Sequence, residues 1–230
     1  GEGFYGGNVS RGRRWEKWAA DRGRDGRAAA ICGTLIQYGT KPEERRRANA
    51  RRQGVLRVEL LEKTLSSEIK FKGRIVTLRL DEAELPNGRK ASREVVEHPG
   101  GVVILPLYED GTVTLVRQFR YPFQKVIAEL PAGKLEYGED HRLAALRKLS
   151  EEVGAVPDEL TYLGCIYTSP GFSSEVLHMY LARGLHQGAC HPDEDEFLER
   201  ERIPFQTLVE RVMSGEIADG KTVAAALKVK

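Results

Sequence analysis

Four charged side chains near the middle of the chain have the spacing needed to form one reactive cluster. Arg147, Lys148, Glu151 and Glu152 fall in an amphipathic stretch, residues 140–153, whose apolar positions recur every three to four residues. Positions i, i+3 and i+4 share one face of a helix, so residues 148, 151 and 152 converge on one point. Clustered carboxylate oxygens are the ligands that Mg²⁺ or Mn²⁺ prefers.

A second acidic element occupies residues 193–196, which read Asp-Glu-Asp-Glu. With the helix carboxylates it would supply the oxygen-rich surroundings of a cation. The alternative interpretation is structural, because the helix residues can form ordinary ion pairs on a solvated face and the acidic run can be a solvated turn. The helix alone favours this alternative.

The spacing of residues 133–155 favours the chemical interpretation. The stretch reads GKLEYGEDHRLAALRKLSEEVGA and resembles the Nudix box, G-x5-E-x7-R-E-U-x-E-E-x-G-U, in which U is a bulky apolar residue. Two positions depart from the pattern: Ala155 fills the last U, and Lys148 stands where the family places a glutamate that is usually a principal metal ligand. The positions in register are Gly133, Glu139, Arg147, Leu149, Glu151, Glu152 and Gly154.

The resemblance implies roles for individual residues. A divalent cation, Mg²⁺ or Mn²⁺, would be held by the backbone carbonyl of Ala132 and by Glu151, Glu152 and Glu196. Glu194 would act as general base and Glu152 as the second catalytic carboxylate. In the structural part of the box, Glu139 and Arg147 would pair to brace the loop against the helix, alongside Gly133 and Gly154.

Lys148 changes what this site is expected to do. A protonated lysine cannot coordinate a metal, and its ammonium precedes Glu151 and Glu152 by three and four residues, so it can pair with both. We expect it to replace a metal rather than bind one, and to lower the negative charge of the cluster by two units relative to glutamate. Impaired rather than abolished activity follows, and Lys148→Glu is expected to raise magnesium-dependent turnover at least about tenfold.

The resemblance covers residues 58–230 and is most specific to the bacterial ADP-ribose pyrophosphatase branch of the family. It is carried by ELPAGKLEYGED, YTSPGFSSEVLHMYLA and HPDEDEFLE, and by Pro170, which lies fifteen residues beyond Ala155, where a proline accompanies ADP-ribose specificity. The implied reaction is hydrolysis of ADP-ribose to AMP and ribose 5-phosphate. Residues matching substrate contacts are Arg93, Glu94, Arg120, Ser169 and Glu175, for each of which a surface ion pair is the alternative.

The same branch implies a domain-swapped homodimer. The small N-terminal antiparallel unit of one subunit would help build the adenosine pocket of the other, and residues 58–99 fit that role. The hydrolase domain proper would then occupy residues 100–230.

The elements that must position these residues are alternating and apolar runs separated by turn signals. Strands are expected at 75–80, 91–97, 102–105, 113–118, 128–130, 160–166 and 176–182, with turns at 86–88 and 109–111. Helices are expected at 140–153, 204–214 and 221–229, with Pro204 in a first helical turn. The expected class is α+β: a Nudix fold, in which helices sandwich a mixed β-sheet, with a small N-terminal antiparallel β unit.

Residues 1–57 differ from the rest of the chain in composition and charge. They hold 10 of the 24 glycines and carry 14 Lys and Arg against 6 Asp and Glu, whereas residues 58–230 carry 22 against 28. We expect a disordered segment or a non-native extension, with a short helix near residues 41–52 and translation starting near residues 55–58. The alternative is a basic arm for nucleic acid, which the acidic remainder of the chain disfavours.

Composition excludes some classes of protein. No apolar stretch approaches the roughly 18 residues of a membrane-spanning helix, so a transmembrane protein is excluded. Cys32, Cys165 and Cys190 form no C-x-x-C pair, which argues against a disulfide framework and favours a cytoplasmic protein. Two alternatives to ADP-ribose hydrolysis remain: hydrolysis of another nucleoside diphosphate sugar, and an ADP-ribose-binding module with weakened catalysis.

Overall fold

The computed structural model describes residues 60–188 and 197–230. The sequence-based expectations for residues 1–57, including the short helix near residues 41–52, lie outside the described residues. The same is true of Glu194 and Glu196.

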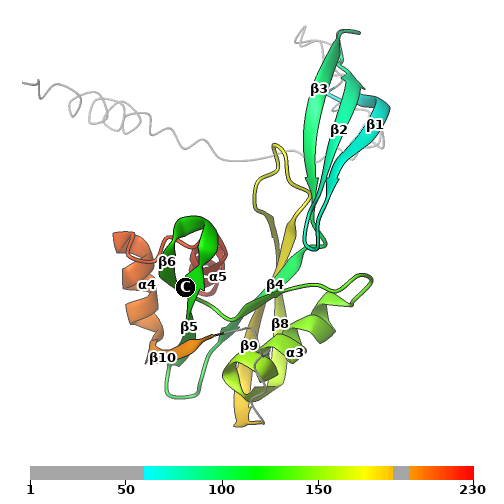
Figure 1. The fold of residues 1–230 in the computed structure, drawn as a ribbon. Helices are drawn as coiled ribbons and strands as arrows, with labels where there is room; N and C mark the ends of the chain where they lie inside the picture. Colours follow the sequence, from blue (N-terminus) through cyan, green and yellow to red (C-terminus); the bar gives the residue numbers. More distant parts are fainter. Residues whose placement is uncertain (1–59, 189–196) are drawn as a thin grey trace, which may run out of the picture. The chain divides into compact units, whose positions relative to one another are not determined.

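A small antiparallel sheet begins the described chain (Figure 1). It consists of β1 (Lys63–Lys72), β2 (Thr77–Glu84) and β3 (Lys90–Glu97) in that order. The expected hairpin is present as β2 and β3, with a turn in which the Gly88 amide donates to the carbonyl of Leu85 at 2.8 Å. β1 was not expected, because seven of its ten residues are polar or charged, and its register against β2 slips twice.

The central sheet is mixed, as the sequence predicts. Its strand order is β7 (Ala132–Lys134), β4 (Gly101–Pro106), β9 (Val176–Gln187) and β8 (Ala155–Tyr167). β4 runs parallel to β9, and the other two pairings are antiparallel. All six residues of β4 are buried, as expected for a strand that is covered on both faces.

A third sheet has the order β10 (Glu199–Pro204), β5 (Thr112–Arg120) and β6 (Lys125–Glu129), with antiparallel pairing. A 3-10 turn, η1 (Tyr121–Phe123), joins β5 to β6. β7 and β10 were not expected, because a three-residue strand and the charged sequence ERERIP lack the apolar run or alternation that identifies a strand.

Three helices complete the described fold: α3 (His141–Val153), α4 (Phe205–Ser214) and α5 (Gly220–Val229). Asp140 caps α3 by accepting hydrogen bonds from the amides of the second and third helical residues. Pro204 was expected inside the first turn of α4 but is its N-cap, because its ψ of 140° continues the extended backbone of β10. No helix in the described ranges is long and apolar enough to cross a membrane.

The two faces of the central sheet pack against different helices (Figure 1). Because side chains alternate along a strand, neighbouring residues of β4 and β9 enter separate cores. One core joins the sheet to α3, and the other joins it to α4, α5 and β5, so helices sandwich the sheet as expected. The α3 core contains Val102, Ile104, Ala144, Leu149, Tyr180 and Ala182, and the other contains Val103, Leu105, Leu115, Met179, Leu181, Leu208 and Ala226.

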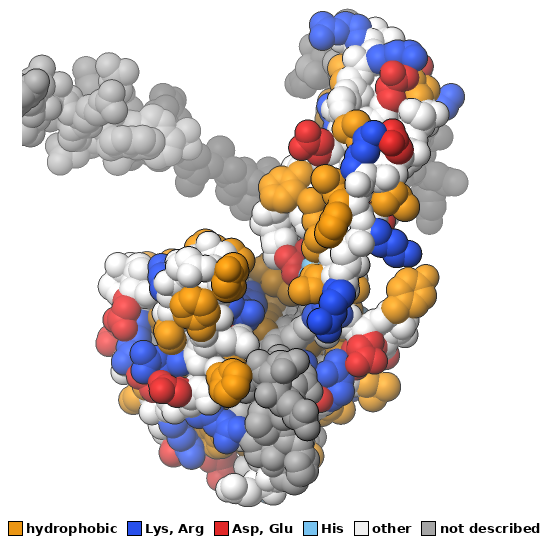
Figure 2. Space-filling model, in the orientation of Figure 1, with side chains coloured by type: hydrophobic (Ala, Val, Ile, Leu, Met, Phe, Trp, Pro, Cys, Tyr) orange, Lys and Arg blue, Asp and Glu red, His pale blue; other side chains and the backbone are white. Residues whose placement is uncertain are grey.

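The small sheet exposes apolar side chains among its charged ones (Figure 2). Ile69 and Phe71 of β1 are more than half exposed, as is Ile75 in the turn that follows. Scattered exposed apolar residues are ordinary, but three of them here belong to one small sheet and its turn.

Candidate active site

The segment from β7 to the end of α3 carries the box residues. Ala132 and Gly133 are held in register against Val103 and Val102 of β4, at the edge of the central sheet. The loop after β7 leads into α3, which ends where Gly154 adopts a left-handed conformation (φ 71°). The helix and the strand are therefore fixed independently, and the box side chains bridge them.

Glu139 and Arg147 form the pair that the sequence predicts. Arg147 Nε donates to Glu139 Oε1 and Arg147 Nη2 donates to Glu139 Oε2, each at 2.9 Å, in the forked geometry of a strong arginine–carboxylate pair. Glu139 also accepts from the Glu136 amide at 2.9 Å. The hydrogen bonds from Arg147 hold the pKa of Glu139 below its ordinary value, so the pair stays charged. The loop is thus tied to the helix.

Glu151 faces two cations on its own helix. Lys148 Nζ lies 2.9 Å from Glu151 Oε2, and Arg147 Nη1 lies 3.3 Å from the same oxygen. Lys148 and Glu151 therefore converge, as the i, i+3 spacing requires. Lys148 is also one of the few buried charged residues of the described chain.

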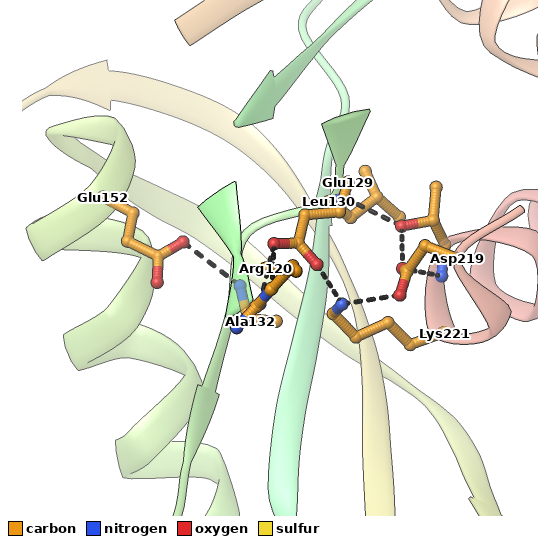
Figure 3. Close-up of polar contacts among 8 residues, drawn as sticks. Arg120, Glu129, Leu130, Ala132, Glu152, Asp219 and Lys221 are labelled. Atoms are coloured by element: carbon orange, nitrogen blue, oxygen red, sulfur yellow. Dashed lines mark hydrogen bonds and ion pairs between the residues drawn. The ribbon is translucent and has the colours of Figure 1, made fainter. Parts of the chain in front are cut away.

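Glu152 is buried and connects three elements. Its Oε2 accepts a hydrogen bond from the Ala132 amide of β7 at 3.2 Å (Figure 3). Its own carbonyl accepts from Arg200 Nε of β10 at 2.5 Å. The last turn of α3 is thereby held against the strand whose carbonyl is a candidate metal ligand.

Arg120 belongs to a separate network around a buried carboxylate (Figure 3). Glu129, at the end of β6, is 1% exposed and accepts from Arg120 Nε at 2.8 Å, while Arg120 Nη2 lies 2.7 Å from the same carboxylate. Its second oxygen accepts from Lys221 of α5, and Lys221 also lies 2.8 Å from Asp219. One carboxylate therefore fixes the candidate phosphate-binding arginine and the start of the last helix.

The same network reaches the backbone that leads to β7. Asp219 caps α5 by accepting from the Thr222 amide at 3.0 Å and from its hydroxyl at 2.6 Å. Thr222 Oγ1 in turn accepts from the Leu130 amide at 2.9 Å, in a fully buried position. Residues 129–132 are therefore bound by α5 at one end and by Glu152 at the other.

The loop at residues 168–175 joins the end of β3. The Val96 amide donates to the Phe172 carbonyl at 2.7 Å, and the Ser174 amide donates back to the Val96 carbonyl at 3.0 Å. Glu175 accepts from Thr168 Oγ1 at 2.7 Å and lies 3.4 Å from His98 Nδ1. The carbonyl of Ser169 accepts hydrogen bonds from the amides of residues 172 and 173. Ser169 and Glu175 thus stand where the small sheet meets the central sheet.

Arg93 and Glu94 do not act as one pair. They are neighbours on β3, so their side chains point to opposite faces of the small sheet. Arg93 makes a forked pair with Glu62, with distances of 2.8 and 2.6 Å, and this contact lowers the pKa of Glu62. Glu94 is on the other face.

A stack of aromatic rings lies at the start of α3. The rings of His141 and His178 are parallel, with centroids 4.0 Å apart, and Tyr162 Oη lies 3.0 Å from His178 Nδ1. Tyr180 Oη shares a short hydrogen bond with His141 Nδ1. Burial, and secondarily the charge of His141, lower the pKa of His178. This stack fastens the first turn of α3 to β8 and β9.

Comparisons with known proteins identify the family. The NUDIX domain model matches residues 97–226, and the nucleoside diphosphate sugar hydrolase N-terminal domain model matches residues 62–96. The chain belongs to the Nudix family. The second match coincides with the small sheet and the first with the rest of the described fold.

Individual relatives match most of the described chain. A protein of Bacillus subtilis named ADP-ribose pyrophosphatase is 42% identical over 168 residues, which are 72% of this chain and 91% of that protein. A methanol dehydrogenase activator of Bacillus methanolicus is 42% identical over 166 residues, 71% of this chain and 90% of that protein. The crystal structure of an ADP compounds hydrolase shares the fold, with a TM-score of 0.66 and 24% identity over 74% of this chain and 94% of its own.

Nudix hydrolases generally need a divalent cation. The donors present are of the right type, because Glu151, Glu152 and the Ala132 carbonyl offer hard oxygens on adjoining elements. Residues 60–188 and 197–230 alone gather no group of three or more His, Cys, Asp or Glu side chains around one point. The donor chemistry thus fits a divalent ion, with an ammonium at one of the family's ligand positions.

Sequence reasoning assigned no role to Glu129, Lys221 or the aromatic stack. Glu129 carries a signal that could have been used, since it is a carboxylate within the apolar run of residues 126–130. Its partner Lys221 lies 92 residues away, which no local pattern reveals.

Proposed function

We propose that this Nudix protein hydrolyses the pyrophosphate of ADP-ribose to AMP and ribose 5-phosphate, with Mg²⁺ or Mn²⁺. The observation that carries the proposal is the assembled box, in which the forked Glu139–Arg147 pair ties the loop to α3, Arg147 also contacts Glu151, and Glu152 accepts a hydrogen bond from β7. The 42% identity to an ADP-ribose pyrophosphatase over 91% of that protein favours this substrate over other nucleoside diphosphate sugars.

The reaction requires a water to approach two negatively charged phosphates. We assign the cation to the Ala132 carbonyl, Glu151, Glu152 and Glu196; when bound, it supplies charge neutralisation at the phosphates. Glu194 acts as the general base that removes a proton from the attacking water, and Glu152 is the second catalytic carboxylate. Both roles come from matched positions of the family pattern.

The remaining candidates bind the substrate. Arg120 offers its guanidinium to the phosphates while Glu129 fixes its orientation. Ser169 and Glu175 line the terminal ribose, supported by their place where the loop meets β3. Arg93 and Glu94 contact the substrate from the small sheet, each from its own face.

The side chains of Arg93 and Glu94 point to opposite faces of β3, which is relevant to the oligomeric state. We propose the domain-swapped homodimer that the resemblance implies, in which the small sheet of β1 to β3 helps build the adenosine pocket of the partner subunit, and the two faces of β3 allow Arg93 and Glu94 to contact different sites. The exposed Ile69 and Phe71 supply an apolar contact surface for the partner. Cysteine usage supports a cytoplasmic place of action, and nucleic acid is not a proposed ligand.

The second candidate is an ADP-ribose-binding protein with weakened hydrolysis. Lys148 favours it, because an ammonium stands 2.9 Å from a carboxylate that the metal needs. The two candidates share the fold and the pocket and differ only in turnover.

The test measures AMP release from ADP-ribose by the full chain at roughly 5 to 10 mM Mg²⁺, with EDTA as the blank. GDP-mannose and ADP-glucose serve as competing substrates. We expect ADP-ribose to be preferred and Glu152→Gln to reduce turnover by about 100-fold or more. Glu210→Gln, on the exposed face of α4, is the matched control and should leave turnover unchanged. ADP-ribose binding without AMP release would select the second candidate. A chain that neither binds ADP-ribose nor releases AMP would refute both candidates.

A further inference from the structure

Lys148 is buried although lysine is among the residues least often found inside proteins. The residue is 5% exposed, and its ammonium must be compensated, because a buried unpaired charge is strongly unfavourable. Glu151 provides compensation at 2.9 Å, and its side chain is itself 18% exposed. The pair is therefore an interior feature of the box rather than a solvated surface contact.

The chain makes room for this lysine at Gly133. A Cβ atom on Gly133 would lie 2.4 to 2.6 Å from Cγ, Cδ and Cε of Lys148, which is closer than any real contact. The alkyl chain of Lys148 thus lies directly on the β7 backbone next to Ala132, the candidate carbonyl ligand. From this strand the ammonium reaches Glu151, one of the candidate metal ligands.

The charges of the box change accordingly. Glu139, Glu151 and Glu152 bring three negative charges, and Arg147 and Lys148 bring two positive ones. With a glutamate at position 148, four carboxylates would face a single arginine. Most of the attraction for a divalent ion is therefore already offset within the protein.

We propose that the Lys148 ammonium is a built-in cation that holds Glu151 in place, so the carboxylate site assembles without a metal and binds divalent ions weakly. The inference concerns the metal site of the proposed enzyme and rests on the proposed function in that respect. It predicts a fold whose stability does not depend on the metal. Conversely, Lys148→Glu should make the stability of the site metal-dependent, because mutual repulsion of the carboxylates is relieved only by an ion.

The experiment measures binding of Mn²⁺ alone, without substrate, by electron paramagnetic resonance of free Mn²⁺. The wild-type chain is compared with Lys148→Glu and Lys148→Met, and Lys230→Glu controls for the added negative charge on the surface. We expect affinity to rise in the order Lys, Met, Glu, with glutamate at least about tenfold above lysine. Methionine keeps an unbranched side chain as far as the Cε position and lacks the ammonium, so a steric block by the alkyl chain would instead leave the affinities of the Met and Lys forms equal.

Thermal unfolding gives the second readout. An ion present at about 100 times its dissociation constant raises Tm by about 5 to 10 °C in a chain of this size. We expect such a rise for Lys148→Glu and less than about 2 °C for the wild type at the same Mn²⁺ concentration. If Lys148→Glu fails to fold even with Mn²⁺, the Lys148→Met variant decides, since its affinity must still exceed that of the wild type.

Equal Mn²⁺ affinity for the wild type and the Lys148→Met variant, or a wild type that is strongly stabilised by Mn²⁺, would overturn the inference. Neither readout uses ADP-ribose. If the affinity order holds but no variant releases AMP, the inference stands and the proposed function fails. If the wild type releases AMP and the affinity order is absent, the proposed function stands and the inference fails.

Discussion

The carboxylate of Glu129 should be a major contributor to stability, and Glu129→Gln tests this. The side chain is buried and accepts from Arg120 and Lys221, whose ends belong to β5 and α5. Glutamine keeps the size and one acceptor but removes the charge. Lys221, whose side chain is 12% exposed, then keeps the carboxylate of Asp219 at 2.8 Å.

The size of the effect follows from these exposures. Removing one partner of a buried ion pair destabilises proteins by about 3 to 5 kcal/mol. Arg120 is 39% exposed and can turn to water, and Lys221 keeps Asp219, so we expect the lower end, about 3 kcal/mol. For a folded unit of this size, this corresponds to a Tm lower by about 6 to 12 °C.

Thermal and urea unfolding of the full chain measure the change. Glu199→Gln is the matched control, because its pair with Arg117 is exposed and should contribute less than about 1 kcal/mol. A Glu129→Gln chain as stable as the Glu199→Gln control would refute this account of the network.

Three further changes test the frame of the site. Leu149→Ala, in the core between α3 and the central sheet, should lower the free energy of unfolding by about 2 to 5 kcal/mol in urea titrations, and a smaller loss would show that the core collapses to fill the space. Gly154→Ala should cost about 1 to 2 kcal/mol in the same assay because of its positive φ, and no loss would mean that the helix end rearranges freely. Burial lowers the pKa of His178 in the folded chain, so folding favours its neutral ring. The contribution of this residue to the free energy of unfolding is therefore complete above the unfolded pKa of 6.5 and declines as the pH falls below that value. His178→Phe should therefore lose less stability than the wild type between about pH 7.5 and 5.5, and equal losses would contradict the assignment.

Local patterns in the sequence predict the box well because its contacts are local. The Glu139–Arg147 pair and the Lys148–Glu151 pair join residues eight and three positions apart, across one loop and one helical turn. Their spacing alone brings them together once α3 forms. Likewise, the buried run of β4 identifies a strand covered on both faces.

Contacts between distant parts of the chain were not predictable in this way. Only three of the ten residues of β1 are apolar, so its pairing with β2 is what makes it a strand. β10 is similarly defined by β5, which precedes it by about 80 residues. The aromatic stack combines side chains from α3, β8 and β9, whose proximity no local spacing reveals. Tertiary pairing, rather than propensity, determines these features.

The helix α5 supports the proposed active site together with the box. The Leu130 amide is held by Thr222 of α5, and the Ala132 amide is held by Glu152 of α3. Only Pro131 separates these two anchored residues, and proline fixes its own φ. The carbonyl of Ala132 therefore has little freedom to move, and its position depends on both helices. A change in α5 should reach the proposed metal site through this short segment without touching any box residue.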